Sequence, residues 1–290
     1  MTSTERAINA LFDKLSADLA GLRPDDRDQA LCPLCLGRFG RDSIADKSPR
    51  GLSIEHVIPR SVGGQLKTLT CRACNNDHGS ALDSHFAGMI GIEDWAQGDG
   101  SELKGTVQVG GIPLPMHLTR DENGLTSIRI VGGKPEALDR FKETMKGLGD
   151  GDSVQLNFSL DYAELPARKA LVRIAYLGMF CLLGYRFVLS DAGVFARGVL
   201  SGGEIEMVRL LTPQVSNVEI ENVDNDFIMT RIGDVAYFNL VRTHTLRERR
   251  YAVILPSPEL AMEEIPHHLS AIAKALHGKQ CRISGIKTAQ

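Results

Sequence analysis

The chain has 290 residues, of which 43% are apolar and 24% charged, and its formal net charge is -3. This composition is typical of a soluble globular protein of one or two domains, and it excludes a fibrous or a disordered chain. The slightly negative net charge also excludes a surface that is basic throughout, so any nucleic acid would have to be bound by a local patch.

The N-terminal segment predicts an amphipathic helix over residues 5–22. Its apolar side chains recur every three or four residues, at Ile8, Leu11, Phe12, Leu15, Leu19 and Leu22. Charged residues interrupt the segment, which a secretory signal would not tolerate. The longest apolar run, from Ile174 to Tyr185, is shorter than the ~20 residues of a membrane span. We therefore expect a cytoplasmic protein that makes no membrane contact and whose thiols stay reduced.

The composition changes along the chain in a way that indicates two domains. Residues 31–83 hold four cysteines but few long apolar runs, which indicates a small domain held by something other than a large core. Residues 92–105 are rich in glycine and acidic side chains and predict a linker. With the boundary near residue 100, we expect domains at 1–100 and 101–290.

Strand and helix patterns alternate in the second domain. Alternating or β-rich segments predict strands at 106–109, 114–118, 127–131, 154–158, 227–232, 235–241 and 251–255. Helical patterns with proline near the start or glycine past the end predict helices at 135–146, 166–183 and 266–276. The mixture predicts an α+β fold with an antiparallel sheet, whose role stays open between target recognition, regulation and formation of a homodimer.

Two C-x2-C pairs, Cys32–Cys35 and Cys71–Cys74, are the clearest chemical signal in the chain. Six cysteines placed at random in a chain of this length would give only about 0.1 such pairs. Two residues between the thiols let both sulfur atoms face one ion, and two pairs supply four thiolates, the donor set of a structural Zn²⁺ site. The alternatives are four buried free thiols or a redox dithiol. Cys181 and Cys281 have no such partner in the sequence.

The segment between the two pairs is longer than the ~15 to 20 residues that are typical of a plain zinc ribbon. It contains the string E-H-V-I-P-R at 55–60, followed by Gly63 and Gly64, and the second pair continues into N-N-D-H-G at 75–79. A carboxylate beside an imidazole, with amide and imidazole side chains after a cysteine pair, is typical of a metal-and-base site.

Together, the cysteine pairs, the E-H-x-I-P-R-x-x-G-G string, the C-x2-C-N continuation and the G-x-x-L-D ending at Asp83 resemble the HNH endonucleases of the ββα-metal (His-Me finger) class, in the variety with a four-cysteine zinc site. The resemblance covers residues 32–83. It implies a small zinc-stabilised nuclease domain, a β-hairpin followed by a helix, ahead of the larger α+β domain. It also implies hydrolysis of phosphodiester bonds in nucleic acid, with DNA favoured over RNA by the habit of the family.

By this resemblance His56 is the general base, and an imidazole titrates near neutral pH, as such a base must. Glu55 is a hard oxygen donor suited to a catalytic Mg²⁺ or Mn²⁺. Asn75 occupies the position at which relatives carry a metal-binding Asn or His, and His78, three residues on, shares its helix face. Either would complete the protein ligands of the ion. Alternation along a strand points Glu55 and His56 apart, so the strand is expected to bend there.

Each assignment has a structural alternative. Glu55 could be a salt-bridge acid, and Asn75 could cap the helix that follows. The family often has an asparagine in the loop between the two strands that steadies the catalytic histidine, but none occurs between His56 and Cys71. The candidates to replace it are Gln65, Thr68 and Asn76.

Positive charge is concentrated beside the proposed site. From Arg38 to Arg72 there are seven bases against three acids, a local charge of +4 in a chain of net charge -3. Arg60, Lys67 and Arg72 are the candidate phosphate contacts, because such patches attract nucleic-acid backbones without regard to sequence. A merely solvated basic face is the alternative. A second basic cluster consists of Arg242, Arg247, Arg249 and Arg250.

The sequence therefore favours a metal-dependent endonuclease. The alternative is a catalytically inactive, zinc-stabilised module that binds nucleic acid or protein without cleaving it. The intact Glu55–His56 pair favours the enzyme, and the missing loop asparagine favours the module.

Overall fold

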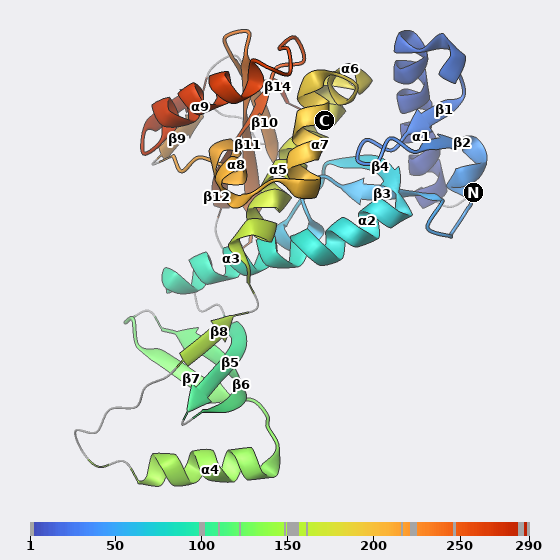
Figure 1. Ribbon diagram of the computed structural model, residues 1–290. Coiled ribbons are helices and arrows are strands. Elements are labelled where there is room, and N and C mark those ends of the chain that lie inside the picture. Colours follow the sequence, from blue (N-terminus) through green and yellow to red (C-terminus); the bar gives the residue numbers. More distant parts are fainter. Residues whose placement is uncertain are drawn as a thin grey trace. The chain divides into compact units, whose positions relative to one another are not determined.

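A computed structural model describes residues 3–98, 102–109, 111–121, 123–147, 149, 157–160, 162–215, 217–220, 225–245, 248–283 and 287–288. The chain forms two compact units. The first combines Met1–Ser84 with Leu165–Gln290, and the second is His85–Glu164. Helices and small, mostly antiparallel sheets make up both, so the predicted α+β class is confirmed (Figure 1).

The N-terminal part of the first unit is built from one long helix and several short elements. They are α1 (Ser3–Leu22), β1 (Gln29–Leu31), β2 (Arg38–Gly40), β3 (Leu52–His56), β4 (Lys67–Cys71) and α2 (Arg72–His78). The strands form two antiparallel pairs, β1 with β2 and β3 with β4. Helix α1 buries Ile8, Phe12, Leu15 and Leu19 of the predicted amphipathic face, whereas Leu22 at its end is exposed.

The C-terminal part of the first unit is organised around α5 (Glu164–Leu183), most of whose side chains from Ala170 to Phe180 are buried. The other helices are α6 (Tyr185–Val188), α7 (Asp191–Gly202), α8 (Ile205–Leu211) and α9 (Ile265–Leu276). The strands are β9 (Asn217–Ile220), β10 (Phe227–Ile232), β11 (Ala236–His244), β12 (Glu248–Pro256), β13 (Gln280–Ile283) and β14 (Lys287–Thr288).

These strands form an antiparallel sheet in the order β12-β11-β10-β14 and a parallel pair of β9 with β13. Helix α5 packs closely on the sheet at Gly178, where an added Cβ would come within 2.4 Å of the ring of Phe227. Asn239 of β11 also contacts α5, through its amide nitrogen and the sulfur of Met179. Together these contacts show that α5 is the central helix of the C-terminal part.

Helix α5 and the first residue of α6 also contact the N-terminal part of the unit. The hydroxyl of Tyr185 accepts a hydrogen bond from the backbone nitrogen of Leu31 at 2.8 Å and donates to the carbonyl of the same residue at 2.7 Å. The buried hydroxyl of Tyr176 donates to the carbonyl of Pro33 at 2.5 Å. Leu31 and Pro33 lie on either side of Cys32. The start of the first cysteine pair is therefore held by hydrogen bonds from residues more than a hundred positions further along the chain.

The second unit has its own core. It consists of α3 (Ser84–Ala96), β5 (Leu103–Val109), β6 (Ile112–Arg120), β7 (Thr126–Ile130), α4 (Pro135–Lys146) and β8 (Asn157–Leu160), with the strands in the order β7-β6-β5-β8. Trp95 and Phe141 pack on a core formed by Leu103, Val107, Leu114, Met116 and Leu118.

This organisation differs from the predicted division at residue 100, which falls inside the second unit. The predicted linker at 92–105 is also shorter in the structure, because α3 continues to Ala96 and β5 begins at Leu103. Of the predicted strand at 154–158, residues 154–156 lie outside the described residues, and the last two belong to β8. No helix among the described residues is long and apolar enough to cross a membrane.

Replacing Tyr185 with phenylalanine tests the contact between the two parts of the first unit. We expect Tyr185→Phe to lower the free energy of unfolding by about 1–3 kcal/mol, because the buried backbone groups of Leu31 lose their partner. Thermal and urea denaturation would measure the change. Tyr237→Phe is the matched control, since Tyr237 is buried but its hydroxyl makes no hydrogen bond within the described part of the chain. Equal stability of both variants would contradict the expectation.

Candidate functional site

The candidate site is built on the β3–β4 hairpin and on α2, which follows it without a linker. The antiparallel register runs from Leu52 opposite Cys71 to His56 opposite Lys67. Helix α2 is attached to β3 by Asn75, whose amide nitrogen donates to Ser53 Oγ and to the carbonyl of Ile54, both at 3.0 Å. The structure therefore has the strand, strand and helix order that the sequence predicts.

Two glycines form the turn that follows β3. Gly63 has a φ of 92°, in the left-handed region that favours glycine. A Cβ on Gly64 would lie 2.0 Å from the carbonyl oxygen of Ile58, so a side chain does not fit there. The turn is also held from the C-terminal part of the unit, because Asp226, the residue before β10, accepts through Oδ2 from the backbone nitrogen of Gln65 at 3.2 Å.

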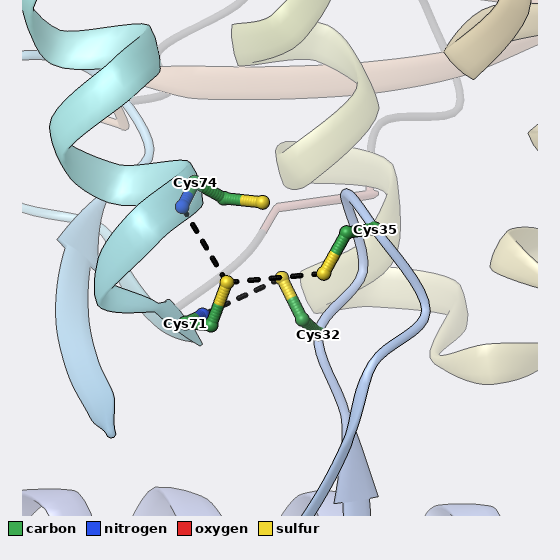
Figure 2. Close-up of side chains that lie close together, drawn as sticks. All are labelled: Cys32, Cys35, Cys71 and Cys74. Atoms are coloured by element: carbon green, nitrogen blue, oxygen red, sulfur yellow. Dashed lines mark hydrogen bonds between the residues drawn. The ribbon is translucent and has the colours of Figure 1, made fainter. Parts of the chain in front are cut away.

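The four cysteines of the two C-x2-C pairs come together at the start of α2. Cys32, Cys35, Cys71 and Cys74 each offer a sulfur atom, and these atoms all lie within 4.8 Å of one another. Figure 2 shows the four side chains turned toward one another from the knuckle after β1 and from the junction of β4 with α2. The sulfur atoms of Cys35 and Cys71 are 3.8 Å apart. Tetrahedral zinc with Zn–S bonds of about 2.3 Å requires ~3.8 Å between sulfur atoms, so the four cysteines are positioned to bind a metal ion.

Hydrogen bonds within the cluster favour the thiolate at Cys35 and Cys71 and the thiol at Cys32. A hydrogen bond from Cys32 lowers the pKa of Cys35 to about 5 and is also the main cause that lowers the pKa of Cys71 to about 6, while the same contacts and burial raise the pKa of Cys32. Since the thiolate is the metal-binding form of cysteine, the cluster suits a cation. Cys181 lies apart from it, and burial raises the pKa of its thiol to about 11.

Glu55 lies in a buried ion pair. Its side chain is 3% exposed, and Oε1 accepts from Arg173 of α5 at 2.7 Å. The other terminal nitrogen of Arg173 donates to Asp83 Oδ1 at 2.6 Å. Burial raises the pKa of Glu55 to about 7, with a further contribution from Asp83, and the Arg173 guanidinium opposes this rise. The second oxygen, Oε2, is buried and has no hydrogen-bond partner among the residues that the structure describes.

His56 is the last residue of β3 and is half-buried. Burial lowers the pKa of its imidazole, and the positive charges of Lys67 and Arg60 lower it further, so the neutral ring is favoured. The ladder continues without a bulge through Glu55 and His56, so the expected bend between them is absent and the two side chains leave β3 on opposite faces.

The structure also describes His78 and the three residues that could orient His56 in place of the missing loop asparagine. His78 ends α2, burial lowers the pKa of its ring, and Nδ1 is buried without a partner. The residues considered as replacements for the loop asparagine are Gln65, Thr68 and Asn76. None of them makes a hydrogen bond to His56 within the described residues.

The basic residues beside the site differ in their surroundings. Arg60 and Lys67 are exposed and form no ion pair within the described residues. Arg72 is half-buried, and its Nε donates to the carbonyl of Asp46 at 3.0 Å. In the second basic cluster, Arg242 and Arg250 both bind the carboxylate of Glu248, and Arg247 lies outside the described residues.

Sequence reasoning missed Arg173. It is fully buried, and it is the residue that holds Glu55. The available signal was an arginine within the apolar stretch of α5, because a buried guanidinium needs carboxylate partners. Which carboxylates those are was not readable, since Glu55 and Asp83 lie far from it in the sequence.

Comparison with known families supports the reading of this region. Residues 44–90 match the family model of the HNH endonucleases, a segment that includes β3, β4 and α2. No curated protein and no solved structure matches the chain. The resemblance inferred from the sequence motifs is confirmed, and the N-terminal region contains an HNH-type domain.

Metal content tests the cysteine cluster. We expect Cys35→Ser to lose most of the zinc that the purified protein carries, because a tetrahedral site with three thiolates is open and binds the ion less tightly. The midpoint of thermal unfolding should also fall, by ~10 °C if the loss of metal costs about 3 kcal/mol or more. Elemental analysis and circular dichroism would measure both. Cys181→Ser is the control, and metal content equal to that of the wild type in Cys35→Ser would contradict the assignment.

Proposed function

We propose that the chain is a metal-dependent endonuclease, a hydrolase that cleaves phosphodiester bonds in nucleic acid, with DNA as the preferred substrate. The observation that carries this proposal is the position of His56 within the matched HNH segment. It ends β3, and burial together with two exposed cations, Lys67 and Arg60, lowers the pKa of its imidazole. A base beside exposed positive charge suits an attack by water on a phosphate.

The four-cysteine cluster would hold a structural Zn²⁺. The donor set is all sulfur, which suits zinc and not the magnesium or calcium of an oxygen site. A closed site of four thiolates leaves no position for substrate, so this ion would stabilise the fold without taking part in the reaction.

We assign a second, divalent cation to Glu55, Asn75 and His78. Glu55 Oε2 and His78 Nδ1 belong to a group of buried side-chain atoms, with Thr70 Oγ1 and Trp95 Nε1 among them, that have no hydrogen-bond partner within the described residues, and water or an ion commonly binds such atoms. The amide nitrogen of Asn75 is already used, which leaves Oδ1, an oxygen donor. These residues would hold Mg²⁺ or Mn²⁺, which when bound would stabilise the charge that develops on the phosphate and the leaving oxygen.

Few protein donors are available to this cation. Among the described residues, the cysteine cluster is the single group of three or more His, Cys, Asp or Glu side chains close enough to share an ion. Magnesium is commonly bound by one or two carboxylates together with water and substrate phosphates. A site based on Glu55 and Asn75 would therefore be completed by the nucleic acid itself.

The proposed reaction gives His56 and Glu55 different tasks. In an in-line displacement, the attacking and the leaving oxygens lie on opposite sides of phosphorus. His56 would take the proton of the attacking water, while the cation on Glu55 would act on the side of the leaving group. Because the regular strand sends the two side chains to opposite faces, this division requires β3 to bend at His56 when the cation and the nucleic acid bind.

Exposed cations would hold the backbone of the nucleic acid. Arg60 and Lys67 are exposed and without ion pairs in the described part of the chain, so they can neutralise phosphates. Arg72 is less available for contacts with phosphate, because its Nε already donates a hydrogen bond to the carbonyl of Asp46. A homodimer through the C-terminal part stays a prediction from the sequence.

A second candidate function, binding without cleavage, is favoured by one observation. The imidazole of His56 has no hydrogen-bond partner within the described residues, whereas a catalytic base is usually oriented by a third group. The assay below separates the two functions.

Cleavage of supercoiled plasmid tests the role of His56. With Mg²⁺ or Mn²⁺, we expect the wild type to nick or linearise the plasmid and His56→Ala to lose ~100-fold or more of the rate, because the proton acceptor is gone. The exposed His267→Ala on α9 is the matched control and should cleave like the wild type. Equal rates for His56→Ala would remove His56 as the base, and no cleavage by any protein would favour the binding module.

The salt dependence of DNA binding tests the basic residues. The double variant Arg60→Gln/Lys67→Gln should weaken binding and reduce the slope of log affinity against log salt by ~2, about 0.9 for each lost phosphate contact. Fluorescence anisotropy with a labelled duplex, in calcium to prevent cleavage, would measure it. Lys274→Gln, an exposed cation on α9, is the control. An unchanged slope in the double variant would contradict the assignment.

A further inference from the structure

Arg173 is the most unusual charged residue of the first unit. It lies in the middle of α5, is 0% exposed and belongs to the C-terminal part of the chain, outside the segment that matches the HNH family. Removing a guanidinium from water costs several kcal/mol, and pairing it with carboxylates seldom returns more than this cost. Stability alone is therefore a weak reason for its presence, and its contacts suggest another one.

The guanidinium divides its two terminal nitrogens between two carboxylates. NH1 donates to Glu55 Oε1 at 2.7 Å and NH2 donates to Asp83 Oδ1 at 2.6 Å. Glu55 lies in β3, and Asp83 ends a π-helical turn, Gly79–Asp83, directly after α2. One side chain thus connects the strand before α2 with the turn after it.

This arrangement uses only one oxygen of Glu55. A bidentate arginine pair, the common geometry for a buried carboxylate, would occupy both. Here Oε2 stays buried and unpartnered, and so does Nδ1 of His78 at the end of α2. Two of the three donors assigned to the divalent cation are thus buried atoms that the protein leaves without a hydrogen bond.

We propose that Arg173 is a positioning residue of the nuclease site, which holds Glu55 through Oε1 so that Oε2 is kept for a divalent cation. The inference rests on the proposed function in that it assumes a cation at Glu55. It assigns to α5 a part in the site that the HNH segment cannot supply by itself. Arg173 touches neither substrate nor cation and acts through Glu55.

Mn²⁺ alone is the probe that tests this role, in the full-length, zinc-loaded protein. Electron paramagnetic resonance of free Mn²⁺ gives its affinity without any cleavage reaction. The variant Glu55→Gln should lose the Mn²⁺ ion that is bound at Glu55, and this loss identifies which bound Mn²⁺ belongs to the proposed site. Arg173→Lys keeps the positive charge but loses the planar fork, and we expect it to bind Mn²⁺ ~10–100-fold more weakly, as is usual when the partner of a metal ligand is changed.

Asp83→Asn is the matched control. It alters the second carboxylate on the same guanidinium and leaves the contact between Arg173 and Glu55 in place. We expect its Mn²⁺ affinity to stay within about threefold of the wild-type value, although both variants should lower the midpoint of thermal unfolding. Weaker Mn²⁺ binding in Arg173→Lys, but not in Asp83→Asn, separates positioning of Glu55 from a general loss of stability.

A charge-balanced variant covers the case in which Arg173→Lys does not fold. Arg173→Gln/Asp83→Asn keeps the net charge of the cluster while removing the fork, and its Mn²⁺ affinity should also fall. Affinity equal to or above that of the wild type would show that the guanidinium merely balances charge, and would overturn the inference. It would equally be overturned if the wild type bound no Mn²⁺ or if Glu55→Gln bound it normally.

The proposed function can fail separately. If the wild type binds Mn²⁺ through Glu55, and Arg173→Lys weakens this binding, the inference is supported even if no protein cleaves plasmid DNA. In that case the endonuclease proposal fails, and the site is a metal-binding site of another function.

Discussion

The convergence of four cysteine sulfur atoms is the constraint on which the candidate site depends. Residues from Leu52 to Val62 and the adjoining β4 bury only a few large apolar side chains, too few to hold a hairpin and a helix in one arrangement. The cluster joins the knuckle after β1 to the junction between β4 and α2. Since α2 starts at this junction, a bound ion would fix where Asn75 and His78 stand relative to β3.

Helix α5 provides the second constraint, and it comes from the other end of the sequence. Tyr185, just after the helix, holds the backbone next to the first cysteine pair, while Arg173 holds Glu55. The HNH segment is therefore part of a larger unit. The cysteine cluster and the buried hydrogen bonds of Tyr185 and Arg173 hold it in place. The second unit, His85–Glu164, is inserted between the two parts of the first.

The sequence predicted those features that depend on neighbouring residues. The C-x2-C spacing and the E-H string identified the cysteine cluster and the hairpin, because each motif is local and its chemistry needs that spacing. The amphipathic helix α1 was predicted by the periodicity of its apolar residues, and the helix at 135–146 by a proline near its start and a glycine after its end, which are also local signals.

Features that depend on distant pairing were not predictable in this way. Nothing in the residues around Glu55 indicates that its partner is Arg173, which lies 118 positions further along the chain. The division into two units also depends on contacts between residues that lie far apart in the sequence. A boundary placed near residue 100 from composition alone could not take such contacts into account. Helix α8 and the pairing of β9 with β13 also escaped the sequence analysis, since they are short and depend on tertiary packing. Helix α7 escaped it although it is as long as α4, because glycines at three of its positions weaken the helical signal.

The source of the oxygen atom in the cleaved product tests the central claim most directly. When a duplex oligonucleotide is incubated with the wild-type protein and Mg²⁺ or Mn²⁺ in ¹⁸O-labelled water, mass spectrometry should find one ¹⁸O in a new 5′-phosphate and a free 3′-hydroxyl on the other fragment. This result is predicted because water attacks phosphorus and the 3′-oxygen leaves. Intact DNA, or 3′-phosphate ends, would contradict the account.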